Sequence, residues 1–190
     1  MNKKRTPSRE LGFTLVELLL VMTITLTLTT MAIGYSRVGN DSLYLQQSVQ
    51  KVLTDLNQAA SYALSSPARS DGGRYCGFGL HFSGDHYLFY GAVPPSAGCA
   101  GTRSYDTTPG SRDHVFYTTM LNHSSIQRVI AGGTAAHDIF FLPPDPAVYV
   151  DGATTTTPVE IVVQSERGVT TSVCVNQIGR ATLKTSASCS

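Results

Sequence analysis

The chain is 190 residues long, which is enough for one domain of ordinary size with an appended segment. Hydrophobic residues make up 42% and charged residues only 14%, which excludes a wholly disordered chain, since disorder needs low hydrophobicity and many charges. The net charge of +1 argues against a strongly basic nucleic-acid-binding protein, and a single long apolar stretch excludes a polytopic membrane protein.

The first residues differ in charge from the rest of the chain. Residues 1–12 carry a net charge of +3, and the chain without them carries −2. The apolar stretch from Phe13 to Tyr35 follows this basic segment. As a helix it would span about 34 Å, which is enough to cross a bilayer core. The positive charges before it predict a cytoplasmic N-terminus and a C-terminal body on the other side of the membrane.

Glu17 lies inside the apolar stretch and indicates more than a membrane anchor. A carboxylate in the bilayer costs at least about 2.5 kcal/mol, so it suggests a function and a partner. Cleavage after Gly12 would supply that partner, because the new α-amino group of Phe13 would be cationic at neutral pH. Glu17 of one copy could then pair with the Phe13 amine of a neighbouring copy. Because a buried charge is costly to leave unpaired, this pair would determine both that the two copies associate and how their helices are aligned.

The motif GFTLVE at residues 12–17, placed between a basic leader and an apolar tract, resembles the class III signal of type IV pilins and type II secretion pseudopilins. The resemblance implies cleavage between Gly12 and Phe13 by a prepilin peptidase, N-methylation of Phe13, and retention of the apolar helix. It further implies a single-pass inner-membrane precursor held in lipid. An inner-membrane assembly platform would then extract this precursor so that it joins other pilin subunits in an extracellular pilus or pseudopilus.

Two other interpretations of the N-terminal segment are open. An ordinary secretory signal also has a basic region and an apolar region, and residues 30–32 (TMA) offer a small-residue cleavage site. An uncleaved signal anchor would instead keep the helix in the membrane. Glu17 has no purpose in a secretory signal, and this favours the pilin-like interpretation.

The helix is expected to continue past the membrane as an amphipathic segment that ends before Pro67. Its apolar residues recur at spacings of three and four: Leu45, Val49, Val52, Leu53, Leu56, Ala60, Ala63 and Leu64. Poor helix formers near the membrane exit predict a kink or local melting in a filament: Gly34, Gly39, Asn40, Asp41 and Ser42. The threonines at positions 23, 25, 27, 29 and 30 can bond their hydroxyls to the preceding turn, which makes them tolerable in lipid.

Short segments with a period of two residues, separated by glycine and proline, predict an antiparallel β body from about residue 68 onward. The expected strands are 75–82, 86–92, 115–120, 126–130, 139–142, 148–151, 159–164, 169–176 and 178–184. Residues 83–85 predict a hairpin turn, and 94–109 and 154–157 predict loops.

The predicted fold class is therefore α+β, with a long N-terminal transmembrane helix packed against a C-terminal antiparallel β body. Its parts are a leader peptide (1–12), the transmembrane half of the helix (13–36), the amphipathic half (37–66) and an extracytoplasmic globular domain (67–190).

All four cysteines follow the apolar stretch, at positions Cys76, Cys99, Cys174 and Cys189. An even number beyond a membrane segment suggests two disulfides in an oxidising compartment. The spacing favours Cys76–Cys99 and Cys174–Cys189, although four cysteines permit three pairings. None of the spacings is C-x-x-C, so we expect no metal site, and no other cofactor is implied.

The order of elements, with residues 172–180 as a closing strand, resembles GspH/FimT-type minor pilins and pseudopilins. Some FimT-type pilins bind DNA during natural transformation through a Gly-Arg-x-Arg segment. Here Gly179 and Arg180 match that segment, but Thr182 stands where the second arginine would be, with Lys184 as a partial substitute. The resemblance makes Arg180 and Lys184, with Arg167 as a further cation, candidates for weak and salt-sensitive DNA contact.

The five histidines, at positions 81, 86, 114, 123 and 137, form no recognisable catalytic motif. Neither a G-x-S-x-G nucleophile motif nor a phosphate-binding loop is present. The sequence thus favours a structural filament subunit that is not an enzyme. A DNA-binding or surface-binding tip subunit is the second hypothesis, and a secreted or anchored enzyme is the third. The choice among retractile pilus, secretion pseudopilus and competence pilus is open.

Overall fold

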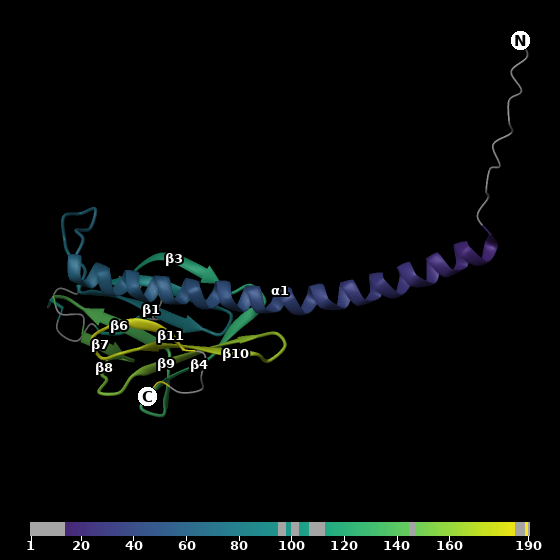
Figure 1. Cartoon of the computed structure of the whole chain (residues 1–190). Helices are drawn as coiled ribbons and strands as arrows, with labels where there is room; N and C mark the ends of the chain where they lie inside the picture. The colour runs from purple at the N-terminus through teal and green to yellow at the C-terminus, as the bar shows by residue number, and fades with distance from the viewer. Residues whose placement is uncertain are drawn as a thin grey trace, which may run out of the picture. The chain divides into compact units, whose positions relative to one another are not determined.

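The structure is a computed structural model that describes residues 14–94, 98–99, 103–106, 113–144, 147–184 and 189, without the side chains of 34–39. One helix, α1 (Leu15–Ser65), precedes eleven strands among these residues, which confirms the predicted α+β fold with a long N-terminal helix and an antiparallel β body (Figure 1). The chain divides into two compact units, Met1–Asn40 and Asp41–Ser190. We describe each by itself.

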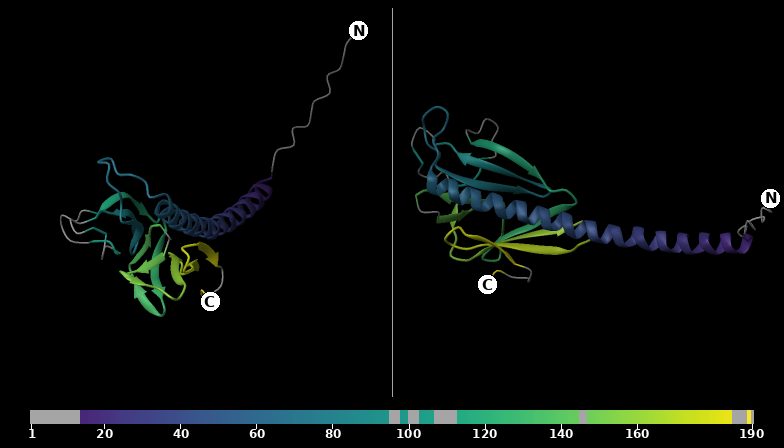
Figure 2. Two further views of the ribbon diagram at one scale, coloured as in Figure 1. Left: turned by 90° about the vertical axis from the view of Figure 1, so that its left-hand side faces the viewer. Right: turned by 45° about the horizontal axis from the view of Figure 1, so that its top comes forward.

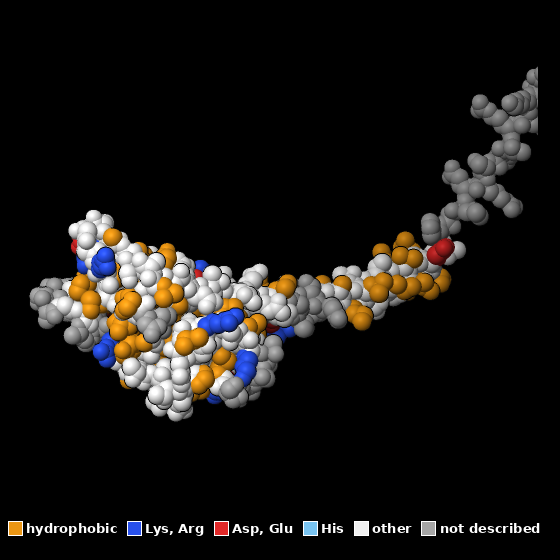
Figure 3. All heavy atoms as spheres, turned by 60° about the vertical axis from the view of Figure 1, so that its left-hand side comes forward, with side chains coloured by type: hydrophobic (Ala, Val, Ile, Leu, Met, Phe, Trp, Pro, Cys, Tyr) orange, Lys and Arg blue, Asp and Glu red, His pale blue; other side chains and the backbone are white. Residues whose placement is uncertain are grey.

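The described part of the first unit is an exposed, apolar length of α1. The segment Leu15–Ile33 is long and apolar enough to cross a membrane, and all its side chains are exposed (Figure 3). The threonine hydroxyls in it donate to carbonyl oxygens three or four residues earlier, at 2.7–3.0 Å. This confirms the hydroxyl bonding expected from the sequence. The backbone of α1 stays helical through residues 34–42 in the single subunit.

The second unit contains two antiparallel sheets beside the remainder of α1 (Figure 2). The first sheet has the order β3-β2-β1-β6-β7-β8. Its strands are β1 (Gly77–Ser83), β2 (His86–Ala92), β3 (His114–Met120), β6 (Asp138–Leu142), β7 (Ala147–Val150) and β8 (Ala153–Thr154). The second sheet has the order β11-β10-β9-β4-β5. Its strands are β4 (Ser124–Ala131), β5 (Thr134–Ala136), β9 (Val159–Ser165), β10 (Thr170–Val175) and β11 (Ala181–Lys184).

One hydrophobic core joins α1 to both sheets. The buried apolar side chains of α1 are Leu45, Val49, Val52, Leu56, Ala59 and Ala63. They share the core with β1 and β2 residues such as Leu80 and Phe89, and with β9 and β10 residues such as Ile161 and Val173. The predicted amphipathic stripe is therefore confirmed except at Leu64, which is 61% exposed. Leu64 follows Ala63 on the helix and is turned about 100° away from the core, and Ala59 is buried instead.

The opposite face of the first sheet is covered by part of the segment expected to be a surface loop. Cys76, Tyr90, Phe140 and Tyr149 form a second buried cluster there, and Tyr105 packs against it. The Cys76–Cys99 disulfide and Arg103, whose guanidinium lies 4.8 Å from the Tyr149 ring centroid, belong to the same covering segment. The described residues of 94–109 therefore pack against the first sheet instead of forming only a surface loop.

Three expectations about the strands are wrong. Two short strands, β5 and β8, were not predicted, and β8 includes Thr154, the first residue of the loop expected at 154–157. The last strand starts at Ala181 rather than at residue 178. The reason is a turn in which the Gly179 amide donates to the Asn176 carbonyl at 3.0 Å, with Gly179 at a positive φ of 77°.

Candidate functional site

The candidate site is the beginning of α1, where Thr14 caps the helix. The Glu17 amide donates to Thr14 Oγ1 at 3.3 Å, and the Leu18 amide donates to the Thr14 carbonyl at 3.2 Å. A threonine at the cap with a glutamate three residues later is the capping-box pattern. This role of Thr14 was missed in the sequence analysis, although the T-x-x-E signal is visible at residues 14–17.

The cap places Glu17 in the first turn of α1. A negative side chain near a helix N-terminus gains about 0.3–1 kcal/mol from the helix dipole. This gain is smaller than the cost of at least about 2.5 kcal/mol for a carboxylate in a bilayer. Capping alone therefore does not account for Glu17 in a membrane. Gly12 and Phe13, where we predict cleavage and the new amine, lie outside the described residues.

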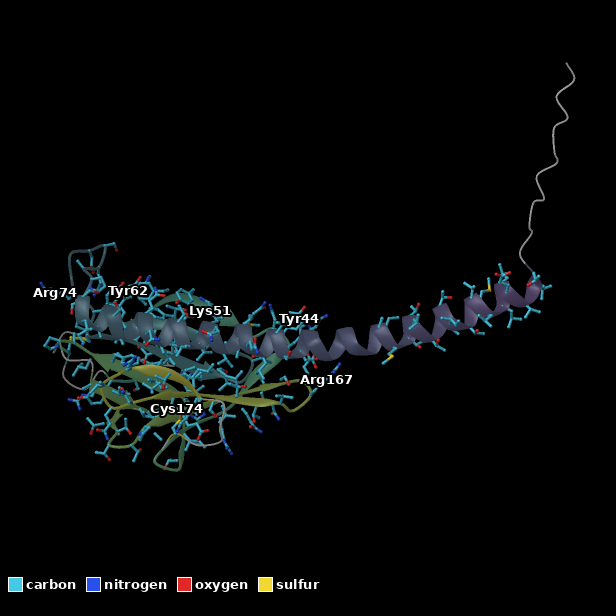
Figure 4. All side chains as sticks on the ribbon, viewed as in Figure 1. Tyr44, Lys51, Tyr62, Arg74, Arg167 and Cys174 are labelled. Atoms are coloured by element: carbon cyan, nitrogen blue, oxygen red, sulfur yellow. A yellow bond between two sulfur atoms is a disulfide. The ribbon has the colours of Figure 1, made fainter. Side chains whose placement is uncertain are left out.

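The four cysteines form two disulfides, Cys76–Cys99 and Cys174–Cys189, with Cα–Cα distances of 5.2 and 5.7 Å. The second bond joins β10 to a residue beyond the end of β11 (Figure 4). All four cysteines belong to the second unit and follow the apolar helix in the sequence.

The candidate DNA contacts do not form a compact cationic cluster. Arg180 is exposed in the turn before β11, whereas Lys184 is half-buried at the end of that strand. Four residues of extended chain separate them by about 13 Å. Arg167 lies elsewhere, in the turn between β9 and β10, and forms an ion pair with Asp41. Arg167 therefore does not join Arg180 and Lys184 as a third candidate for DNA contact.

The histidines are dispersed and have different neighbours. Three of them pair with carboxylates through Nδ1: His81 with Asp138 at 2.9 Å, His86 with Asp85 at 2.8 Å, and His123 with Glu166 at 2.9 Å. The hydrogen bond from His86 lowers the pKa of Asp85. In the part of the chain that the structure describes, no three His, Cys, Asp or Glu side chains are grouped as metal ligands.

A buried polar cluster fastens α1 to the first sheet, and the sequence analysis missed it. Asp55 is fully buried on α1, and Tyr87 of β2 donates its hydroxyl to Asp55 Oδ2 at 2.6 Å. Lys51 donates to Asp55 Oδ1 at 3.1 Å and lies 5.2 Å from the Tyr117 ring centroid (Figure 4). Burial, followed by the interactions with Asp55, raises the pKa of both Tyr87 and Tyr117. The spacing of Lys51 and Asp55 on one helical face was the available signal.

Comparison with known families identifies the N-terminal segment. Residues 7–33 match the model of the prokaryotic N-terminal methylation motif. The matched span contains Gly12, Phe13, Glu17 and most of the exposed apolar helix. The chain therefore carries the signature of type IV pilins and pseudopilins, which confirms the resemblance inferred from GFTLVE. Neither a curated protein nor a solved structure matches the chain.

Proposed function

We propose that this chain is a structural subunit of a type IV pilus-like filament, a minor pilin or pseudopilin rather than an enzyme. A prepilin peptidase cuts between Gly12 and Phe13, and the Phe13 amine is methylated. The subunit waits in the inner membrane through its apolar helix. An assembly platform then moves it into a filament outside the cell.

The observation that carries this proposal is an acidic residue in the first turn of α1, at the start of its exposed apolar segment. From Leu15 to Ile33, Glu17 is the only charged residue. Its cost in a membrane exceeds the gain from the helix dipole, so a cationic partner is required. The Phe13 amine of an adjacent subunit meets this need only after cleavage. The processing step thus creates the partner that assembly uses.

The exposed apolar side chains support the same proposal. None of the residues of Leu15–Ile33 is buried within the subunit. Packing these helices together in a filament core would take them out of lipid while they remain in an apolar environment. The disulfide-bonded body, Asp41–Ser190, would then lie outside this core and determine which partners bind.

The first experiment is intact-mass analysis of the mature chain from cells that contain a prepilin peptidase. We expect a chain that starts at residue 13 with a methylated amine. A chain that starts near residue 33 would show a secretory signal instead, and a chain that retains residues 1–12 would show an uncleaved anchor.

The second experiment changes Glu17→Gln, with Glu166→Gln on the exposed body surface as the matched control. Cleavage and methylation should continue in both variants. Filament yield should be lost only in Glu17→Gln, because its Phe13 amine has no carboxylate to pair with. A normal filament yield from Glu17→Gln would contradict the proposed pairing.

A DNA-binding minor pilin is the second candidate function, and the exposure of Arg180 in the turn before β11 favours it. The ion pair of Arg167 and the partial burial of Lys184 weigh against strong binding. Arg180→Ala should abolish DNA uptake without loss of fibres if this function is correct. Unchanged uptake in that variant would reject it.

A further inference from the structure

A cavity of about 450 Å³ lies between the end of α1 and β3, the outer strand of the first sheet. This cavity, which we call the aromatic hollow, is lined by Tyr62, Arg69, Tyr75, His114 and Phe116, together with smaller residues. Tyr62 is in the last turn of α1 (Figure 4). Phe116 is 38% exposed, and both tyrosines are partly exposed. Partly exposed rings gathered in one cavity are typical of a ligand-binding site.

Two rings of the aromatic hollow lie directly on β2, at a glycine. The ring centroids of Tyr75 and Phe116 are 5.5 Å apart. A Cβ atom at Gly91 of β2 would lie 2.8 Å from the Tyr75 ring and 3.0 Å from the Phe116 ring. Gly91 pairs with His114 of β3, and the ring centroids of His114 and Phe116 are 4.8 Å apart. The absence of a side chain at Gly91 therefore allows the rings to reach the sheet and form an apolar lining.

Polar groups that donate and accept hydrogen bonds accompany this apolar lining. The Arg69 guanidinium lies 5.8 Å from the Tyr75 ring centroid, and its Nη2 lies 2.7 Å from Asp71 Oδ2. Asp71 Oδ1 also accepts from the Gly73 amide at 3.0 Å, which fixes the carboxylate. Among the residues that the structure describes, the Tyr75 hydroxyl and the His114 ring have no hydrogen-bond partner. The aromatic hollow thus offers unused polar groups, while Asp71 balances the charge of Arg69.

We propose that the aromatic hollow binds a neutral sugar ring. One face of such a ring carries C–H groups, which pack on the electron-rich faces of aromatic side chains. Its hydroxyls both donate and accept hydrogen bonds, so they match the guanidinium–carboxylate pair of Arg69 and Asp71 and the free hydroxyl of Tyr75. The inference goes beyond the proposed function, because it gives the body a ligand of its own and does not depend on assembly.

The charge and the polar groups of the aromatic hollow disfavour other classes of ligand. A nucleic acid or another polyanion needs unpaired cations, whereas Arg69 is already paired with Asp71. A purely apolar ligand would remove Arg69 and the Tyr75 hydroxyl from water without replacing their hydrogen bonds. A proline-rich peptide would use the aromatic rings but not the charged pair. A neutral sugar uses both parts of the lining.

The test exposes the purified full-length chain to an array of neutral and acidic oligosaccharides. The chain is kept in a detergent with a zwitterionic head group, because the head group of a sugar-based detergent would compete for the aromatic hollow. We expect one or more neutral oligosaccharides to bind, and calorimetric titration with the strongest of them gives the dissociation constant. The chain contains nine tyrosines and no tryptophan, so a change in tyrosine fluorescence during the titration is a second measurement.

Two variants and a matched control locate the binding. Phe116→Ala removes a ring from the lining and should weaken binding at least about tenfold. Arg69→Gln removes the guanidinium and should weaken binding to a similar extent, and it keeps the test decisive if Phe116→Ala does not fold. The control, Met120→Ala, removes an exposed apolar side chain from the same strand outside the aromatic hollow and should bind as the wild type does. Thermal unfolding shows whether each variant is folded.

Several outcomes would overturn the inference. One is that no oligosaccharide binds the wild type, and another is that Phe116→Ala and Arg69→Gln bind as strongly as Met120→Ala. Binding restricted to sulfated or carboxylated sugars would show an anion site instead. Binding of decaproline in place of every sugar would show a peptide groove. None of these outcomes depends on cleavage after Gly12, so they leave the proposed function to its own experiments.

Discussion

Arg167 Nε lies 2.6 Å from Asp41 Oδ2, so the turn between β9 and β10 is held at the first residue of the second unit. Neighbouring contacts extend this attachment along α1. The Tyr44 ring is 4.7 Å from the ring of His123, which pairs with Glu166. Ser124 donates to Ser48 at 2.6 Å in a buried hydrogen bond. The body therefore holds α1 from Asp41 onward.

This attachment predicts where local opening of α1 stops. In the full-length chain in detergent, amide hydrogen exchange should be slow from Asp41 to Ser65 and faster through residues 34–40, which include Gly34, Gly39 and Asn40. Arg167→Gln removes a partly exposed ion pair of about 1 kcal/mol, so exchange at residues 41–48 should rise up to about fivefold. Arg74→Gln, at the other end of this part of α1, is the control (Figure 4). Equal exchange in both variants would contradict the prediction.

The Asp55–Tyr87 hydrogen bond predicts a large effect of a single helix substitution. Asp55→Ala leaves the buried Tyr87 hydroxyl without its acceptor and should lower the free energy of unfolding by about 3 kcal/mol. Lys51→Ala should cost less, about 2 kcal/mol, because water can reach the place of the half-exposed Lys51 side chain, although the buried Asp55 carboxylate loses its cation. Urea denaturation measures both. The prediction is wrong if the two variants are equally stable.

The buried tyrosines predict a loss of stability in alkali. Burial raises the pKa of Tyr87, Tyr90 and Tyr117 in the folded state, whereas tyrosine in an unfolded chain titrates near about 10. Above that pH the unfolded state binds fewer protons, so the free energy of unfolding falls as the pH rises. Below it, the contribution is fully retained. Phenolate absorbance should show a group of tyrosines that ionise only as the chain unfolds.

The Tyr87→Phe variant is the control for this titration, because it should reduce the amplitude of the unfolding-linked step. Titration of every tyrosine near its ordinary value, with the protein still folded, would show that burial does not protect them.

The backbone contact at Gly79 predicts that β1 tolerates no side chain there. Gly79 pairs with Tyr90 across β1 and β2, and the Tyr90 ring covers it. A Cβ atom at this position would lie 2.7 Å from the Ile139 carbonyl oxygen. Gly79→Ala should therefore lower the free energy of unfolding by about 2 kcal/mol.

Gly73→Ala is the matched control, since its Cβ would approach mainly the flexible side chains of Asp71 and Arg69. That variant should be neutral or slightly stabilising, because alanine restricts the unfolded chain. Thermal unfolding of the two variants decides the matter, and comparable midpoints would reject the steric argument.

The sequence predicts the parts of the fold that have strong periodicity. The stripe from Leu45 to Ala63 and the hairpin around residues 83–85 are local patterns that agree with the final packing. The strand β5, which spans Thr134–Ala136, is three residues long, so its formation depends on pairing with β4 rather than on its own pattern. Leu64 is apolar but exposed, because the burial of a helix face is decided by the elements around it.

At the candidate site and in the buried polar contacts, the sequence again predicts only what is local in the chain. The processing motif is contiguous, so Gly12, Phe13 and Glu17 are visible together in the sequence. The bond between Asp55 and Tyr87 joins residues 32 positions apart and depends on how α1 lies on β2. The same is true of Asp41 and Arg167, which are brought together only by the hairpin of β9 and β10.

The threonine hydroxyls of the apolar helix have a further consequence for transport. Each of these groups bonds within its own helix, as Thr25 does to the carbonyls of Val21 and Met22. The carbonyl oxygens that accept these hydrogen bonds belong to the same helix, so the bonds are kept when the helix moves from one environment to another. The withdrawal from the bilayer that we propose would therefore break no hydrogen bond of these side chains, and the energetic barrier to moving the segment would be set by its apolar surface and by its single carboxylate.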